Sequence, residues 1–359
     1  MLANQKKNFL LILMSLVILL VSYVGLRNDA FLYKRTVATV TSVQTIHRTR
    51  ETDEHDNVDY QIRQRAHVRL LNGEHQGKNV TIINDYTRSQ VVDFPIRKGQ
   101  QVFLNHTDGN YQLTDAKRDT VSGVLMVLVL ILLFVFAGKH ALMIILSIGL
   151  NTLIFILGIH GILDAQGTGP WYLVGGLAVI FTVVTALFVI GMRRVGWSIM
   201  LATILSTLAA VALGYGIMTL FGYRSIHLEQ VRYVTQNPHL IFFAQIVIGA
   251  LGAVLDEASD ISVAVFQMQT TAQKRFAAGM AIGRKIIGPL IAVLFMIFMA
   301  DSFAESILWL RNGNAIAYTV SWVMGLGFVQ SIISAFGIVL AVPITSGLAI
   351  LFSGRGQQE

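Results

Sequence analysis

The chain has 359 residues, of which 54% are hydrophobic and only 13% are charged, and its mean hydropathy is +0.63. Globular proteins carry about 25% charged residues, so this composition excludes a soluble globular protein and indicates an integral membrane protein. There is no cysteine, which excludes disulfide bonds, thiolate chemistry and a lipoprotein anchor. The net charge of +7 has to be interpreted from the positions of the charges, and no nucleic-acid partner is predicted.

An apolar run over residues 9–26 follows Lys6 and Lys7. A basic start followed by an apolar run is typical of either a signal peptide or a first membrane span. The run is long and no A-x-A-like cleavage site follows it. The sequence therefore predicts an uncleaved membrane anchor over residues 1–26.

Residues 27–119 form a polar block that differs from the rest of the chain. Turn residues such as Asn72-Gly73 separate short stretches in which apolar and polar side chains alternate, as they do in half-buried strands. These stretches are 36–43, 66–71, 79–83 and 101–104. Several short strands in about 90 residues predict a small β-barrel or sandwich that resembles an OB-fold.

An acidic run over residues 51–59 could bind a cation, but it lacks the ligand spacing of an EF-hand loop. We expect a solvated loop there. The five histidines of the same block show no zinc-ligand spacing. No metal and no cofactor are therefore predicted.

From Val121 onward the chain is a series of apolar segments, each close to the ~20 residues that cross a bilayer. The predicted spans are 121–138, 141–162, 171–192, 195–221, 240–266, 285–303 and 327–352. Together with the anchor they predict an all-α polytopic membrane helix bundle of about eight spans. The small β-domain is inserted after the first span, and residues 120–359 form the membrane domain.

The basic residues of the short loops predict the orientation of these spans. Ten fall on one side (Lys6, Lys7, Lys139, Arg193, Arg194, Lys274, Arg275, Arg284, Lys285 and Arg355) and three on the other (Arg224, Arg232 and Arg311). The positive-inside rule then places both termini in the cytoplasm and residues 27–119 outside. The external loop 222–239, with Arg224, His227, Glu229, Arg232 and His239, is either a gate or recognition surface or a plain solvated loop.

Three carboxylates, Asp256, Glu257 and Asp260, lie in the apolar segment 240–266. An ionisable side chain at bilayer depth costs about 2.5–3.5 kcal/mol, so these residues are candidates for ion or proton binding. Asp256 and Asp260 are four residues apart and share a helix face, whereas Glu257 points elsewhere. We expect one of the pair to hold a proton, to bind a cation or to pair with a basic residue. The alternative is that the three carboxylates form a solvated helix end at the cytoplasmic rim.

Gly249 and Gly252 precede these carboxylates and predict a backbone break through which carbonyls or helix ends reach a ligand. The cytoplasmic connection 267–285 begins with a stretch, residues 269–275, that is predicted to be an amphipathic or interfacial helix. At its end, Arg284 and Lys285 are the cations nearest in sequence to the carboxylates. They either pair with Asp256 and Asp260 or anchor the chain at the membrane surface.

Residues 243–255 align without gaps to residues 328–340, with seven of 13 positions identical, including Gln245/Gln330 and Gly252/Gly337. Both segments run in the same direction in the predicted topology, so a repeat would be of the parallel kind found in some transporters. Apolar segments also match by chance, and both explanations stay open.

Three motifs resemble the YibE/F family of bacterial multi-pass membrane proteins: Gly249-Ala-Leu-Gly-Ala-Val-Leu-Asp256, Gly279-Met-Ala-Ile-Gly-Arg284 and Gly337-Ile-Val-Leu-Ala-Val-Pro-Ile-Thr345. The end of the β-domain, Tyr111-Gln-Leu-Thr-Asp115, resembles the YibE-type member. The resemblance implies a bacterial cell-membrane protein, often accompanied by a shorter YibF-type partner. Two positions depart from the family pattern, because Lys285 and Gln330 stand where acidic residues are expected.

The sequence thus predicts a membrane permease or secondary transporter of a small solute or ion, with Asp256 and Asp260 as the proton or cation site, assisted by Glu257, Gly249, Gly252 and Arg284. The alternative is a non-transporting scaffold or sensor whose β-domain binds a partner or an envelope component. No hydrolase, metalloprotease or Walker motif is present, so an enzyme is not expected. The expected partners are the lipid bilayer and either a YibF-like subunit or a second copy of the chain.

Overall fold

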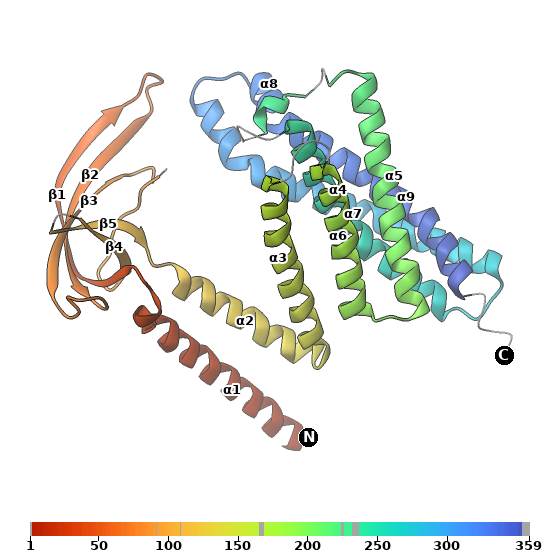
Figure 1. Cartoon of the computed structure of the whole chain (residues 1–359), viewed down its shortest axis with the longest axis horizontal. Coiled ribbons are helices and arrows are strands. Elements are labelled where there is room, and N and C mark those ends of the chain that lie inside the picture. The colour runs from red at the N-terminus through yellow and green to blue at the C-terminus, as the bar shows by residue number, and fades with distance from the viewer. Residues whose placement is uncertain are drawn as a thin grey trace. The chain divides into compact units, whose positions relative to one another are not determined.

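The computed structural model describes residues 2–90, 92–107, 109–164, 169–223, 226–231 and 237–353, with side chains from Phe9 onward. The chain divides into two compact units, an N-terminal unit (Met1–Ala141) and a C-terminal unit (Leu142–Glu359) (Figure 1). The described residues contain eight helices that are long and apolar enough to cross a membrane, and a five-stranded antiparallel sheet follows the first of them. The predicted mostly helical chain with eight apolar segments and one inserted β-region is confirmed.

The N-terminal unit consists of two apolar helices and the sheet. The helices are α1 (Leu2–Arg27) and α2 (Asp119–Ala137), and a 3-10 turn (Ala30–Leu32) follows α1. The strands are β1 (Thr36–Thr52), β2 (Val58–Leu70), β3 (Asn79–Thr87), β4 (Gln101–Thr107) and β5 (Asn110–Ala116). The four predicted strand segments fall on β1 to β4.

The strand order is β3-β2-β1-β4-β5, with antiparallel pairing throughout. Along β2 the side chains of Ala66, Val68 and Leu70 are buried, and the residues between them face outward. Because side chains alternate across a strand, one face of the sheet is apolar and surrounds the core of this unit. The outer strands β3 and β5 contact each other, so the sheet curls around that core.

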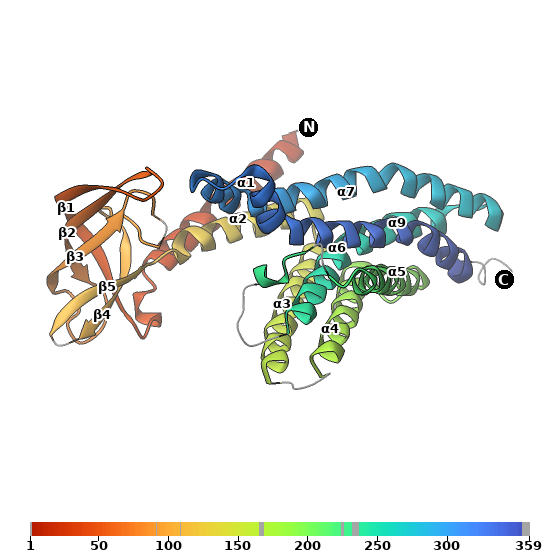
Figure 2. The same cartoon turned by 90° about the horizontal axis from the view of Figure 1, so that it is seen from above.

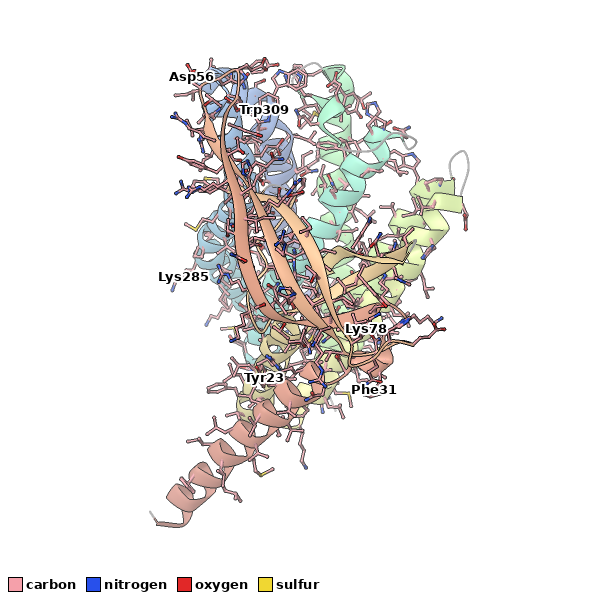
Figure 3. All side chains as sticks on the ribbon, turned by 90° about the vertical axis from the view of Figure 1, so that its left-hand side faces the viewer. Tyr23, Phe31, Asp56, Lys78, Lys285 and Trp309 are labelled. Atoms are coloured by element: carbon pink, nitrogen blue, oxygen red, sulfur yellow. The ribbon has the colours of Figure 1, made fainter. Side chains whose placement is uncertain are left out.

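The connection between β3 and β4 covers the core through Ile96, which is 2% exposed. Two buried polar side chains hold its backbone. Gln64 accepts a hydrogen bond from the Ile96 amide at 3.0 Å, and Asn84 donates one to the Phe94 carbonyl at 2.9 Å. At the far end of the β1–β2 hairpin lies Asp56, whereas Phe31 lies beside the end of α1 (Figure 3).

The C-terminal unit is built from long helices: α3 (His140–Asp164, which begins at the boundary), α4 (Gly169–Thr185), α5 (Arg194–Leu220), α6 (Pro238–Gln267), α7 (Ala272–Arg311) and α9 (Gly325–Ser353). Short elements connect them, namely two π-helical turns (Ala186–Ile190 and Val320–Met324), a 3-10 turn (Leu228–Gln230) and α8 (Ile316–Thr319). Helix α6 contacts α4, α5, α7 and α9, and α9 contacts α5, α6 and α7. Helices α6 and α9 therefore form the centre of this unit.

Helix α7 is one continuous helix of 40 residues and runs beside α9 (Figure 2). At 1.5 Å per residue it is roughly 60 Å long, about twice the hydrocarbon thickness of a bilayer. The predicted start of this span at residue 285 is therefore wrong, since residues 272–285, predicted as a connection, are the first turns of α7. Gly279 and Gly283 hold these turns against α9, where a Cβ atom on either glycine would lie 2.5 Å or less from Ser346 or Val342.

A candidate intramembrane carboxylate site

The three carboxylates of α6 occupy different surroundings. Glu257 is completely buried, at 0% exposure, whereas Asp256 and Asp260 are exposed on the surface of the C-terminal unit. Glu257 lies on the same helix face as the buried Val254 and Ile261, three residues before it and four after it. Asp256 and Asp260 do share a face, as predicted, but the interior position belongs to Glu257.

Three helices meet next to Glu257. A Cβ atom on Gly337 of α9 would lie 3.1 Å from Val254 of α6 and 3.5 Å from Ala210 of α5. Glu257 is one helical turn beyond Val254, and Ser206 is one turn from Ala210 in antiparallel α5. The carboxylate is therefore inside the bundle, at the level where α5, α6 and α9 pack together.

Neither carboxylate oxygen of Glu257 has a hydrogen-bond partner among the described residues. The hydroxyls of Ser206, Thr203 and Thr345 are also buried and also lack a partner there. All three lie on α5 or α9 within about one turn of the level of Glu257. A carboxylate with hydroxyl oxygens around it suits a proton or a cation that prefers oxygen ligands. No group of three or more His, Asp or Glu residues in the described ranges could hold a metal ion.

Arg284 and Lys285, for which pairing with the aspartates and anchoring at the membrane surface were the two alternatives, lie outside the bundle. Gly283 of α7 packs against Val342 of α9. Val342 lies about one turn beyond Gly337, which contacts Val254 of α6. Arg284 and Lys285 are therefore level with the carboxylates, which follow Val254 on α6. Both are exposed, and no ion pair within the described parts of the chain joins either of them to Asp256 or Asp260.

The predicted backbone break at Gly249 and Gly252 is wrong. Helix α6 is continuous from Pro238 to Gln267, and both glycines face outward, with no described atom apart from those of the adjoining helix within 4 Å of the place that a Cβ atom would take. The physical reason is that an apolar segment offers its amides and carbonyls no partners except those of the helix itself. A glycine therefore stays helical there unless another group replaces the lost hydrogen bond.

Comparison with known families decides the affiliation of the chain. The model of the YibE/F-like protein family matches residues 125–355, and the model of the YibE/F family N-terminal domain matches residues 31–118. The chain belongs to the YibE/F family. Among curated proteins and among solved structures, no match was found. The two matched regions of this YibE/F protein are the sheet with its connections and the helical region from α2 to α9.

Lys285 and Gln330 stand at the two positions where acidic residues are expected in the family. Lys285 is exposed on α7. Gln330 of α9 donates a hydrogen bond of 2.6 Å to the side-chain oxygen of Gln245 on α6. These two glutamines are equivalent positions of the internal sequence match, so the matching segments lie side by side in parallel.

The loop between α5 and α6 is only partly described, and Arg224 and Arg232 lie outside the described residues, as does Arg355 at the C-terminus. His227 stacks on Trp322 at 3.8 Å between ring centroids and lies 3.2 Å from the Ser321 hydroxyl. His239 packs against Tyr223. These aromatic contacts connect the loop to neighbouring helix ends.

A second buried charge lies in the N-terminal unit, and sequence reasoning missed it. The fully buried ammonium of Lys117 lies 2.8 Å from Asp29 and 2.9 Å from Asp119, and it donates to the Leu26 carbonyl at 2.6 Å. It thereby ties the end of the sheet to the end of α1 and the start of α2. We call Lys117, Asp29, Asp119 and Tyr33 the joint.

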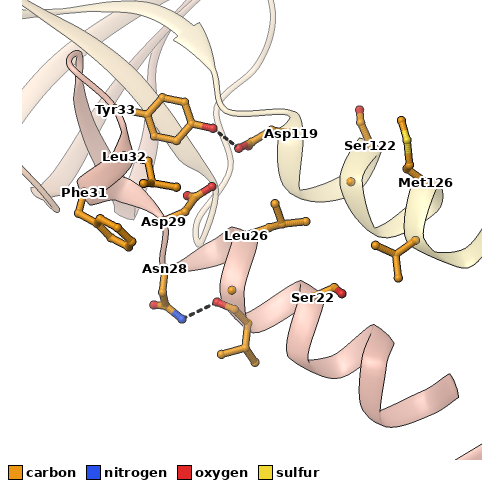
Figure 4. A pocket seen from close by; sticks show the side chains of 14 residues that line it. Ser22, Leu26, Asn28, Asp29, Phe31, Leu32, Tyr33, Asp119, Ser122 and Met126 are labelled. Carbon is orange, nitrogen blue, oxygen red and sulfur yellow. Dashed lines mark hydrogen bonds between the residues drawn. The ribbon is translucent and has the colours of Figure 1, made fainter. Parts of the chain in front are cut away.

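Tyr33 completes the joint by donating its hydroxyl hydrogen to Asp119 (Figure 4). This hydrogen bond, together with burial and the charges of Asp119 and Asp29, raises the pKa of Tyr33 to about 12. The joint borders a cleft of about 980 Å³ within the N-terminal unit, with Leu26, Phe31 and Met126 among its apolar lining. Its charged groups are paired with one another, so the joint fits a structural role.

Proposed function

We propose that this YibE/F protein is a membrane permease for protons or a small cation, with Glu257 as the binding group. The observation that carries the proposal is a fully buried carboxylate without a hydrogen-bond partner among the described residues. An uncompensated charge at such a place is costly, and intramembrane ionisable residues commonly belong to ion pathways. A proton or a cation would neutralise the group, and the surrounding hydroxyls offer further oxygen ligands.

The depth of Glu257 follows from the exposed charges around it. Asp256, Asp260, Arg284 and Lys285 lie at one level on the outside of the bundle. Because lipid disfavours exposed charge, we infer that this level is the cytoplasmic boundary of the hydrocarbon region. The 20 residues of α6 from Pro238 to Glu257 then span roughly 30 Å, the thickness of that region.

The opposite ends of α7 and α9 support this boundary. Tyr318 contacts both Trp309 and Trp322, with ring centroids 5.7 and 5.8 Å apart. Trp and Tyr are enriched where a membrane meets water. Lys285 and Trp309 lie far apart along α7 (Figure 3), and the helix rises about 36 Å over the 24 residue steps from one to the other. Glu257 would then be near the cytoplasmic mouth, with both termini in the cytoplasm and residues 27–119 outside.

A polar route from Glu257 toward the outside would follow the contact between α6 and α9. Its components are the buried Ser334 and Ser331 on α9 and, at the surface of the unit, the Gln245–Gln330 pair, of which Gln245 is exposed. The remaining buried residues along this contact, such as Val254 and Ile338, are apolar. We therefore expect α6 and α9 to move apart during transport, since a closed apolar contact would stop an ion.

The transport experiment uses the whole protein in liposomes that contain a pH-sensitive dye, with a potassium diffusion potential to drive proton entry. We expect the wild-type protein to acidify the liposomes faster than protein-free controls. Glu257→Gln should abolish the difference, and the matched variant Asp256→Asn should keep it. A parallel series with a sodium gradient and a sodium-sensitive dye tests a cation in place of a proton. The proposal would be refuted if the wild-type protein moved neither ion faster than protein-free liposomes do, or if Glu257→Gln kept full activity.

The proposed boundary has its own test, which the absence of native cysteine makes simple. Ile248 and Asp256 are both exposed on α6 and lie two turns apart. A membrane-impermeant maleimide applied from the cytoplasmic side should label Asp256→Cys and leave Ile248→Cys unlabelled. Equal labelling of both positions would contradict a boundary at this level.

The second candidate function is a scaffold or sensor, and the joint favours it. A sheet tied to two helix ends by buried ion pairs is a fixed platform on the membrane. We propose that the sheet is an OB-like barrel, because its strand order, with contact between β3 and β5, is that of the OB-fold. A YibF-like subunit or a second copy of the chain would then bind to this platform or to the helices. Absence of ion flux together with co-purification of such a partner would support this function over transport.

A further inference from the structure

The outward face of β2 carries a stripe of basic side chains. Arg63, Arg65, His67 and Arg69 are all exposed and occupy alternate positions, while the residues between them point into the core. Alternate residues on a strand are about 6.7 Å apart, so the stripe extends over about 20 Å. Arg63 forms a bidentate ion pair with Asp85, at 2.7 and 2.9 Å. No ion pair in the described ranges involves Arg65 or Arg69.

The strands on both sides of the stripe add hydrogen-bonding groups and little negative charge. On β1, Thr39, Ser42 and Gln44 pair with Arg69, His67 and Arg65. On β3, the partners of the same three residues are Asn79, Thr81 and Ile83. The face therefore combines the guanidinium groups of Arg65 and Arg69 with hydroxyl and amide groups. This is the chemistry that binds phosphate together with sugar or polyol hydroxyls.

Acidic residues of this unit are concentrated at one end of the β1–β2 hairpin. Five acidic residues, Glu51, Asp53, Glu54, Asp56 and Asp59, gather at the tip of the β1–β2 hairpin, away from Arg65 and Arg69. The stripe runs along β2 from this acidic tip toward the sheet end that joins α1 (Figure 3). A flat bilayer surface would reach one end of such a stripe, whereas a linear polymer could lie along all of it.

We propose that the outer face of β2 binds a linear anionic polymer of the polyol-phosphate type, with Arg65 and Arg69, about 13 Å apart along the strand, contacting two phosphates of the same polymer chain. His67 and the flanking polar residues of β1 and β3 hydrogen-bond the polyol between these phosphates. Arg63 is held by Asp85 and marks the end of the stripe. This interaction is independent of the proposed ion transport, because it involves only the N-terminal unit.

The test uses the full chain in nanodiscs of phosphatidylcholine, which carry no net charge, and poly(glycerol phosphate) as the probe. We expect binding that weakens as salt is raised, because phosphate contacts release bound counterions. The double variant Arg65→Gln/Arg69→Gln should bind at least ~10-fold more weakly. The matched variant Arg97→Gln/Lys98→Gln removes the same charge from exposed positions of the β3–β4 connection and should bind within about twofold of wild type.

Three comparison probes make the test decisive. Dextran should not bind, because it has no charge. Equal or tighter binding of poly-L-glutamate would show an acidic-protein surface instead, and preferential binding of phosphatidylglycerol vesicles would show a membrane-facing surface; either result overturns the proposal. The proposal is also wrong if the two double variants lose affinity equally, or if poly(glycerol phosphate) fails to bind the wild-type protein.

Discussion

Two fully buried charged side chains, one in each unit, have opposite surroundings. The Lys117 ammonium of the N-terminal unit has three oxygens at 2.6–2.9 Å. The Glu257 carboxylate of the C-terminal unit has no hydrogen-bond partner within the described residues. Removing one member of a buried ion pair typically costs about 3–5 kcal/mol, whereas a lone buried charge has no such partner to lose. Burial alone therefore does not separate a structural charge from a candidate binding group, and the partners of the charge have to be considered as well.

The largest loss of stability should follow from removal of the buried Lys117 ammonium, which has three oxygen partners. Lys117→Met leaves Asp29 and Asp119 without their cation, and we expect a loss of about 3–5 kcal/mol in the stability of the N-terminal unit. Hydrogen-exchange mass spectrometry of β1 and β4 in the detergent-solubilised protein measures this loss. Lys98→Met is the control, because Lys98 is exposed on the same unit. Unchanged exchange in Lys117→Met would mean that the joint does not stabilise the sheet.

The stability of the C-terminal unit depends on close contact between helices, whereas the N-terminal unit is stabilised by buried ion pairs. Gly283→Ala places a Cβ atom 2.4 Å from Val342, so α7 and α9 must separate, at a cost of about 1–3 kcal/mol. Gly288→Ala is the matched control, because no described atom lies within 4 Å of its Cβ position on the same helix. Thermal unfolding followed by tryptophan fluorescence reports on this unit, since all four tryptophans lie in it. Equal melting temperatures for the two variants would contradict the tight contact.

A smaller effect is expected within the joint from Tyr33→Phe. Loss of the hydrogen bond to Asp119 should cost about 1 kcal/mol at neutral pH. The pKa of Tyr33 is raised to about 12, so the neutral phenol is favoured in the folded state. This contribution is complete below the unfolded pKa of about 10 and is lost as pH rises toward about 12.

Stability of the sheet at neutral pH and at about pH 11, measured by hydrogen exchange corrected for its intrinsic pH dependence, tests this assignment. The difference between wild type and Tyr33→Phe should shrink at the higher pH. A difference that stays constant would show that the hydroxyl makes no pH-dependent contribution to the joint.

The smallest change in stability should come from Glu257→Gln. Glutamine has nearly the same volume and no charge, and the carboxylate has no described partner to lose, so we expect a loss below the value of about 1 kcal/mol expected for Tyr33→Phe. Tryptophan-monitored unfolding measures it. A loss as large as that of Lys117→Met would break the comparison, because it would show that Glu257 has a stabilising partner.

Local patterns in the sequence were enough to predict most of the helices and strands of this YibE/F protein. Apolar runs of about 20 residues predicted the eight candidate spans, and two-residue alternation predicted strands that the sheet contains. These predictions succeed because each depends on neighbours within one element. The length of α7 was not predicted, since Arg284 and Lys285 indicated the end of the apolar span, whereas a helix outside the hydrocarbon region continues through basic residues without cost.

Tertiary structure alone decided which charges are buried. Helix α6 is apolar around most of its circumference, so its sequence could not show whether the face of Glu257 or that of Asp256 meets α5 and α9. Lys117 lies in a charged segment that is typical of a protein surface, and its partner Asp29 is distant in sequence. Burial and pairing depend on which faces of separate elements meet. That choice is made by packing between elements, and packing is a property of the folded chain as a whole.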